Sequence, residues 1–278
     1  MPQLNFRSRL ARLPMMLLAL FVVVLQGCSS DDPAPVAPPV IPPVVNADPT
    51  GYYINSGFVD VKAGDNTTQR LVTDVQGMVH DGQLLMLSET ENLTYVGTFS
   101  VNENDISGTV TVYEADVMTQ ANVPLSGMIT QGTRITGTLG GTGVANGTFQ
   151  LDYAADNGPV DMSMVARLLS WEPVTGSPPD LPFLSVSDVA LPVQNIGSAS
   201  SMGGIFTSCD YLGRIEPIAA THLYTVSVTA ANCMNGDILA TPSYTGLVSV
   251  RSDVNANDRL ILVLTNGAYD FSGEYKEQ

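Results

Sequence analysis

TVTVY (residues 109–113) and TFQLDY (residues 148–153) are the two stretches that decide the fold of this chain. In both, apolar or aromatic residues alternate with polar ones, which is the period-two pattern of a strand with one face in the core and one in water. Thr, Val, Ser, Gly, Asn and Asp dominate the rest of the chain, and this composition favours short strands and tight turns. The sequence therefore predicts an all-β, antiparallel protein.

Eight segments of the first half are short, rich in β-favouring residues and bounded by Gly, Asn or Asp. They are Tyr52–Val61, Leu71–Val79, Gln83–Leu87, Leu93–Val101, Ile106–Tyr113, Leu125–Thr130, Arg134–Leu139 and Thr148–Tyr153. Eight strands at this spacing predict an antiparallel sandwich or barrel. The Gly-rich run Thr138–Gly147 is followed by no helix pattern, so we interpret it as strand and hairpin and not as a phosphate-binding loop.

The pattern changes after Tyr153. Val160–Trp171 is the one segment that favours a short helix, which would end before Pro173, and Gly176–Pro182 is typical of a loop. Strands are predicted again at Leu184–Val189, Gly203–Phe206, Gly213–Ile218, Leu223–Thr229, Tyr244–Val250, Leu260–Thr265 and Tyr269–Tyr275. We predict two tandem small β-barrel or sandwich domains, residues 51–165 and 166–278, with the short helix between them. One continuous sandwich is the alternative.

The N-terminal segment has the features of a secretory signal. Arg7, Arg9 and Arg12 precede Leu13–Leu25, which is apolar and uncharged. An apolar stretch of this length is too short for a membrane-spanning helix, which needs about 20 residues, but it suits the apolar region of a signal peptide.

The residues Leu25-Gln26-Gly27-Cys28 resemble the lipobox of bacterial lipoproteins, with an aliphatic residue three positions before the cysteine and a small one just before it. The resemblance implies that residues 1–27 are a cleaved signal peptide and that Cys28 becomes the acylated first residue. Several acyl chains anchor a protein more firmly than one, so the resemblance implies a membrane-anchored chain. Ser29 stands where an aspartate would favour inner-membrane retention, which implies the outer membrane.

Residues 28–50 are predicted to be a tether because they hold a dense run of prolines. Proline favours the extended polyproline II conformation, so some 20 residues could span roughly 60 Å. Without residues 1–27 the chain has 8 basic and 27 acidic residues, a net charge of −19. Such a chain repels nucleic acid and anionic surfaces, so no nucleic-acid partner is expected.

Part of the second half resembles the C-terminal region of uncharacterised gammaproteobacterial lipoproteins. The matching elements are Cys209, YLGRI (residues 211–215), YTVSVT (residues 224–229), Cys233 and YTGL (residues 244–247). The resemblance supports a β architecture and implies no activity.

Cys209 and Cys233 are the two cysteines that remain once Cys28 is lipidated. In an oxidising compartment such a pair is normally bridged, so we predict a structural disulfide between them. A redox-active pair would be expected closer together, as in C-x-x-C.

Few residues indicate chemistry. His80 and His222 are the only histidines, and no HExxH, CxxC or G-x-S-x-G motif is present, so no metal, cofactor or catalytic residue is predicted. Glu89 and Glu91 could form a carboxylate pair of the glycosidase type, although a turn with two acids is more often solvated.

A V-N-x-N-D pattern occurs at Val101–Asp105 and again at Val254–Asp258, each time before an apolar strand. We interpret both as hairpin turns, because Asn and Asp tolerate left-handed backbone. The rival is a calcium loop through Asp253, Asn255 and Asn257, but the sixth and twelfth positions of an EF-hand loop would be Asp258 and Leu264 instead of Gly and Glu.

Together these features predict a lipoprotein anchored in the outer membrane that acts as a non-enzymatic binding or scaffold module of the cell envelope. The expected partner besides the membrane is an envelope protein, a glycan, or a small apolar ligand held in a barrel mouth. The alternative is an envelope hydrolase that works through carboxylates.

Overall fold

The computed structural model describes residues 44–155, 157–158, 171–173, 183–184, 194–202, 206–231, 243–251 and 259–277. Residues 44–278 form a compact unit separate from residues 1–43. Within the described ranges there is no α-helix, and one 3-10 turn, η1 (Gly143–Ala145), is the only helical element. The prediction of an all-β, antiparallel chain is confirmed.

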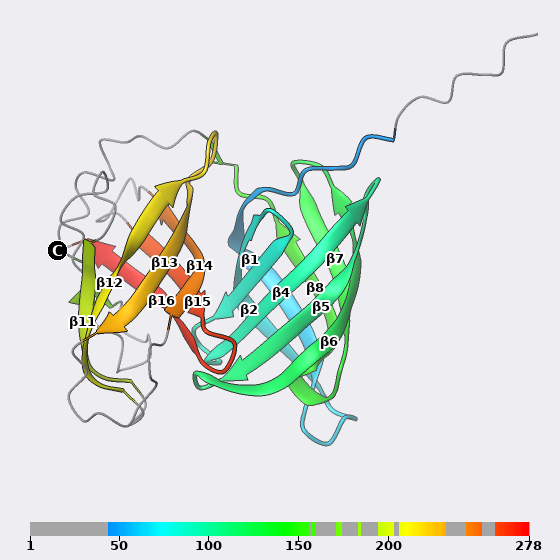
Figure 1. The fold of residues 1–278 in the computed structure, drawn as a ribbon. Coiled ribbons are helices and arrows are strands. Elements are labelled where there is room, and N and C mark those ends of the chain that lie inside the picture. The colour runs from blue at the N-terminus through cyan, green and yellow to red at the C-terminus, as the bar shows by residue number, and fades with distance from the viewer. Residues whose placement is uncertain are drawn as a thin grey trace, which may run out of the picture. The chain divides into compact units, whose positions relative to one another are not determined.

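The first half of the unit is a closed eight-stranded barrel (Figure 1). Its strands are β1 (Gly51–Lys62), β2 (Gln69–His80), β3 (Gln83–Ser88), β4 (Leu93–Asn102), β5 (Asp105–Glu114), β6 (Val117–Thr130), β7 (Arg134–Gly140) and β8 (Asn146–Asp152). Each strand pairs antiparallel with the next, and β8 closes the barrel against β1. All eight predicted strands are present, but β6 begins at Val117, well before the predicted Leu125.

Side chains fill the interior of the first barrel. In the stretch TVTVY, Val110 and Val112 are buried in the barrel core, while Thr109 is exposed. In TFQLDY, Phe149 and Leu151 take the same inward position. An eight-stranded barrel is narrow enough for side chains alone to fill it, so the alternation in these strands specifies a packed core.

Residues Asn46–Asp48, which we call the strap, lie across two turns of the first barrel. The backbone N–H of Ala47 donates to the carbonyl of Glu103 (2.7 Å), and the N–H of Glu103 donates to Oδ1 of Asn46 (2.9 Å). Asp48 and Gln131 exchange two further hydrogen bonds, of 2.9 and 2.7 Å. The strap belongs to the end of the predicted tether, so this part of the tether is bound to the barrel. Residues 28–43 lie outside the described residues.

The second half is a second closed antiparallel barrel. Its strands are β9 (Trp171–Pro173), β10 (Phe183–Leu184), β11 (Gln194–Met202), β12 (Phe206–Pro217), β13 (Leu223–Ala231), β14 (Ser243–Arg251), β15 (Arg259–Thr265) and β16 (Asp270–Glu277). β16 pairs with β9 to close it. The tandem arrangement is therefore the one that forms, and not a continuous sandwich.

Some predictions for the second half fall on residues that are not described. The predicted helix Val160–Trp171 is one of them, except for Trp171, which begins β9. Of the predicted strand Gly203–Phe206, only Phe206 is described, and it begins β12. Strands β9 and β11 were not predicted.

The two barrels share a buried apolar cluster. The inward residues Leu84 and Met86 of β3 belong to the first barrel's core, whereas the outward residues Leu85 and Leu87 belong to a second cluster. That second cluster also contains residues from β13, β14 and β15: Leu223, Leu247, Ile261 and Val263. Strand β3 and strand β15 are consequently buried on both faces.

Polar contacts join the same two barrels. Oγ1 of Thr94 lies 2.8 Å from Oγ of Ser272, and the hydroxyl of Tyr113 lies 2.7 Å from Oγ1 of Thr265. Asp270 is 0% exposed, and its Oδ2 accepts a hydrogen bond from Ser272 (2.8 Å). Its Oδ1 has no hydrogen-bond partner among the described residues. Burial raises the pKa of Asp270 above its ordinary value, so the fold disfavours the ionised carboxylate here.

Candidate binding groove

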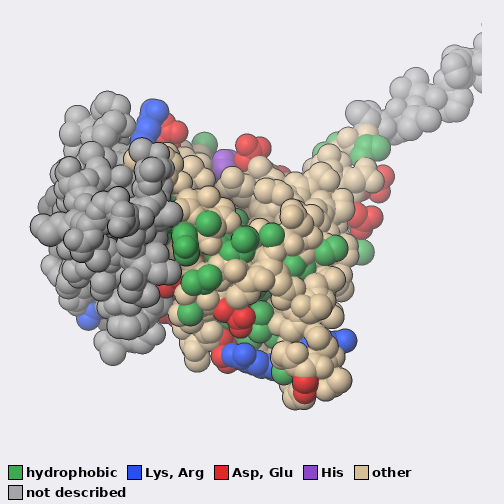
Figure 2. All heavy atoms as spheres, turned by 60° about the horizontal axis from the view of Figure 1, so that its bottom comes forward, with side chains coloured by type: hydrophobic (Ala, Val, Ile, Leu, Met, Phe, Trp, Pro, Cys, Tyr) green, Lys and Arg blue, Asp and Glu red, His purple; other side chains and the backbone are tan. Residues whose placement is uncertain are grey.

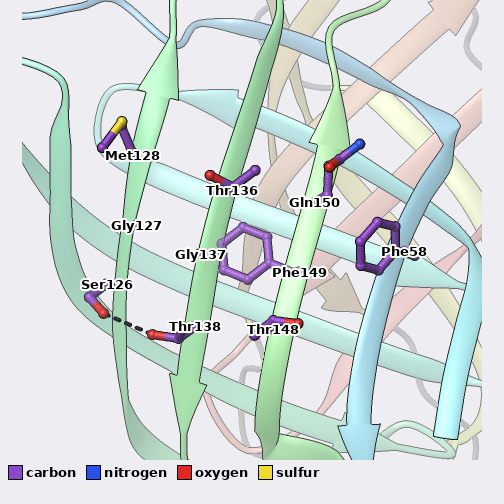
Figure 3. A pocket seen from close by; sticks show the side chains of 10 residues that line it. All are labelled: Phe58, Ser126, Gly127, Met128, Thr136, Gly137, Thr138, Thr148, Phe149 and Gln150. Atoms are coloured by element: carbon purple, nitrogen blue, oxygen red, sulfur yellow. Dashed lines mark hydrogen bonds between the residues drawn. The ribbon is translucent and has the colours of Figure 1, made fainter.

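An open groove of about 470 Å³ lies on the outer wall of the first barrel, across β6, β7, β8 and β1 (Figure 3). Strand register sets its two walls, because paired residues point to the same face of a sheet. One wall is a row of paired, outward residues: Met128, Thr136, Gln150 and Phe58. The other wall is the row Ser126, Thr138 and Thr148. Four different strands therefore build the groove.

The floor of the groove is backbone, and two glycines are part of it. A Cβ on Gly127 would lie 2.2 Å from the carbonyl oxygen of Thr136. A Cβ on Gly137 would lie 2.5 Å from two ring carbons of Phe149. Figure 3 shows the Phe149 ring beside Gly137. Because the ring fills the space that a larger side chain at position 137 would need, the barrel wall stays packed beneath the groove.

The lining side chains carry no formal charge. Four of them, Ser126, Thr136, Thr138 and Thr148, present hydroxyl groups, each of which can donate and accept a hydrogen bond. The hydroxyls of Ser126 and Thr138 lie 2.9 Å apart. On the face drawn in Figure 2, charged side chains are scattered over a surface that is mostly uncharged.

A hydrogen-bonded chain orients the amide of Gln150. Nε2 of Gln150 lies 3.2 and 3.3 Å from the two carboxylate oxygens of Asp152, and Oδ1 of Asp152 lies 3.5 Å from Nε of Arg134. The amide nitrogen faces the carboxylate because the reverse orientation would bring two acceptors together. The amide oxygen of Gln150 therefore faces away from that carboxylate.

The structure places the two histidines apart from this groove. His80 precedes the β2–β3 turn, in which Asp81 (φ 46°) and Gly82 (φ 72°) both adopt left-handed backbone, as a type I′ hairpin turn requires. Nδ1 of His80 is buried and has no hydrogen-bond partner in the described part of the chain. His222 directly precedes β13 and is half-buried.

The acids of the predicted carboxylate pair lie in the β3–β4 turn. Glu91 forms an ion pair with Arg70, and its backbone N–H donates to Oγ of Ser88 (3.3 Å). Glu89 is half-buried in the same turn. The Glu91 carboxylate is therefore engaged by Arg70 at the rim of this turn.

The first V-N-x-N-D pattern is the β4–β5 hairpin, as predicted. Asn102 pairs with Asp105 across a two-residue turn, and Glu103 adopts left-handed backbone (φ 56°). The calcium alternative, Asp253, Asn255 and Asn257, lies outside the described residues.

The cysteine predictions stay predictions. Cys28 and Cys233 lie outside the described residues. Cys209 falls within β12, but its side chain is not described.

A second, smaller hollow of about 220 Å³ lies over β12, β13 and β14, with Gln83 of the first barrel on its edge. Arg214 and Glu216 line it and form an ion pair, so its charges are matched internally. In the described ranges, no group of three or more His, Cys, Asp or Glu side chains lies close enough to hold a metal ion. None of the helices in those ranges is long and apolar enough to span a membrane.

No protein-family model matches this chain, and searches of curated proteins and of solved structures found no match.

Proposed function

We propose that this protein is a lipid-anchored outer-membrane protein whose first barrel is a non-enzymatic binding module, with the groove across β6, β7, β8 and β1 as its ligand site. The observation that carries the proposal is a preformed hollow on a closed barrel, lined by uncharged polar side chains together with Phe58 and Met128. Its volume lies within the range of about 300 to 1,000 Å³ that is usual for ligand pockets. The lipobox at Cys28 supports the anchor.

Binding is favoured over catalysis because the lining contains no titratable side chain. General acid–base and nucleophilic mechanisms need a group that gains or loses a proton, or a nucleophile beside a base. The hydroxyls of Ser126 and Thr138 contact each other, and no histidine or carboxylate lines the groove to activate either. The same observation disfavours the alternative of a carboxylate hydrolase at this site.

The outer groove is favoured over a barrel mouth for the ligand. Inward side chains fill the first barrel, and the strap lies across its β4–β5 and β6–β7 turns. A small apolar ligand would have to displace core side chains, whereas a ligand of the groove would displace only water.

Site-specific photo-cross-linking tests the proposed site. A benzophenone amino acid replaces Met128, in the groove, or Met118, on the same strand but outside the lining; these methionines are 54% and 40% exposed. The chain of residues 1–278 is expressed in a Gram-negative host. We expect an adduct of increased mass at position 128 that is absent or much weaker at position 118. Equal labelling at both positions, or none at 128, would refute the groove as the site.

Lipidation has its own test. Wild-type protein should incorporate an alkyne analogue of palmitate, and Cys28→Ala should not. Label that persists on Cys28→Ala would contradict the proposed anchor.

A further inference from the structure

We infer that the groove binds a neutral glycan, that is, an oligosaccharide segment without carboxylate, phosphate or sulfate groups. This inference rests on the proposed function and names the ligand class of the same site.

The hydrogen-bonding groups of the lining match those of a sugar. Each hydroxyl of Ser126, Thr136, Thr138 and Thr148 is both a donor and an acceptor, as is each hydroxyl of a saccharide. The oriented amide oxygen of Gln150 adds an acceptor. A ligand that is dense in hydroxyl groups can replace the water that these groups bind, whereas a purely apolar ligand would displace that water and offer no hydrogen bond in return.

Apolar contacts stand at opposite sides of the groove. Phe58 lies on β1 and Met128 lies on β6, three inter-strand spacings apart, which is about 14 Å. Figure 3 shows the Phe58 ring beside β8 and the Met128 side chain over β6. An aromatic ring flanked by polar groups offers a surface on which the C–H face of a sugar can pack. The separation fits an oligosaccharide better than a single sugar.

The charge distribution favours a neutral ligand over an anionic one. The lining holds neither Lys nor Arg, the residues that pair with carboxylate, sulfate or phosphate groups. The row Ser126, Thr138 and Thr148 continues on β1 to Asp60, which pairs with Thr148. The Asp60 carboxylate repels an anion at the β1 end of the groove. The chain as a whole is strongly acidic, with a net charge of −16. An anionic polymer would therefore meet repulsion and find no cationic partner in the groove.

The closed barrel disfavours an extended peptide. Peptides that bind to sheets usually add a strand to a free edge, where main-chain groups are unpaired. Here β6, β7, β8 and β1 each have a neighbour on both sides, so the barrel has no free edge at the groove. Side chains are left as the recognition groups, and their hydroxyls suit a sugar.

Asp152 is a positioning residue in this scheme. Its carboxylate accepts from Nε2 of Gln150 and thereby turns Oε1 away from Asp152, while Arg134 holds the carboxylate itself. Asp152→Ala should release the Gln150 amide without removing any lining group.

The inference can be tested by NMR and calorimetric titration of residues 29–278, which contain the whole compact unit 44–278. The probes are neutral hexasaccharides (maltohexaose, cellohexaose, mannohexaose and xylohexaose). An oligogalacturonate hexamer and a Ser/Thr-rich peptide serve as anionic and peptide comparisons. We expect at least one neutral hexasaccharide to shift the backbone amides of Thr136, Thr138 and Gln150.

Variants then locate the contact. Phe58→Ala should weaken that binding about tenfold, and Met128→Ala and Asp152→Ala by smaller factors, whereas Met118→Ala should leave it unchanged. Asp152→Ala should also change the side-chain amide resonances of Gln150 in the free protein, which a loss of general stability would not do selectively.

Three contrary results are distinguishable. If only the oligogalacturonate or the peptide shifts the groove amides, the glycan inference is overturned while the groove remains a binding site. If no probe shifts them and cross-linking at position 128 yields no adduct, both proposals fail. Saccharide binding that is insensitive to Phe58→Ala also overturns the inference.

Discussion

Substituting Gly137 by alanine tests how the floor of the groove is built. The added Cβ would lie 2.5 Å from Cε1 and Cζ of Phe149 and 2.7 Å from the carbonyl oxygen of Ser126. The backbone carbonyl is fixed by the β6–β7 ladder, and the Phe149 ring is buried in the core. Neither can move without disturbing the barrel. Overpacking of this kind costs about 1–3 kcal/mol of unfolding free energy.

Gly140 is a matched control on the same strand. A Cβ at Gly140 would meet its nearest neighbour, Cβ of Pro124, at 3.4 Å, which is ordinary contact. Gly140→Ala should therefore stabilise the protein by about 0.4–1 kcal/mol through the lower entropy of the unfolded chain. The two alanine variants should differ by about 1.4–4 kcal/mol, and a difference of 2 kcal/mol corresponds to roughly 1 M in the urea midpoint.

Urea unfolding of residues 29–278, followed by circular dichroism, measures this difference. The double variant Gly137→Ala/Phe149→Leu should lose less stability than the sum of its single variants, with a coupling of more than about 0.5 kcal/mol, because the smaller side chain makes room for the Cβ. If Gly137→Ala proves as stable as Gly140→Ala, the reasoning about the floor is wrong.

Three further predictions concern the barrel interface and the cysteines. The free energy of unfolding should fall as the pH rises from 3.8, the ordinary pKa of an aspartate, through the raised pKa of Asp270, because the folded state holds the Asp270 proton more tightly than the unfolded state does. Urea midpoints measured from about pH 4 to 8 should therefore decrease with pH, and Asp270→Asn should make this decrease smaller. Leu247→Ala should lower the free energy of unfolding by about 2–5 kcal/mol in the same assay, because Leu247 is fully buried in the cluster between the barrels. A decrease of less than about 1 kcal/mol would contradict the burial of Leu247 in that cluster. Thiol titration of the unfolded, unreduced protein should find no free thiol from Cys209 and Cys233, and two reactive thiols would exclude the disulfide.

The alternation of apolar and polar residues predicted most strands of the first barrel, because in a strand the side chains of successive residues point to opposite faces, so the pattern can be identified within each segment alone. The start of β6 was missed because Val117–Pro124 is mostly exposed and lacks a clear apolar alternation. Closure was left open because the pairing of β1 with β8 joins the two ends of the barrel's sequence, and a strand pattern does not state its partner.

The interface between the barrels had a signal that we did not use. LLML (residues 84–87) and LILVL (residues 260–264) are continuous apolar runs, and such runs are typical of strands buried on both faces. In the structure, β3 and β15, which contain these runs, both contribute to the cluster between the barrels.

The groove had no comparable signal. Phe58 and Gln150 are far apart in sequence, and they become neighbours only through the register of β1 against β8. Gly137 could have been noted as an interruption of a strand, but the aromatic ring that explains it comes from β8. To predict a binding surface that is built across four strands, one must know how those strands pair residue by residue, and the sequence alone does not reveal this pairing.

The strap also determines how the protein would respond to mechanical force. Force applied to the chain at residue 44 would act first on the hydrogen bonds that join the strap to Glu103 and Gln131. It would reach β1, which starts at Gly51, only after these bonds had broken. These bonds would have to break before tension could peel β1 from its neighbours. Loss of the strap, for example in Asn46→Ala/Gln131→Ala, should therefore lower the force at which the first barrel unravels in a single-molecule pulling experiment, with little effect on its stability at rest.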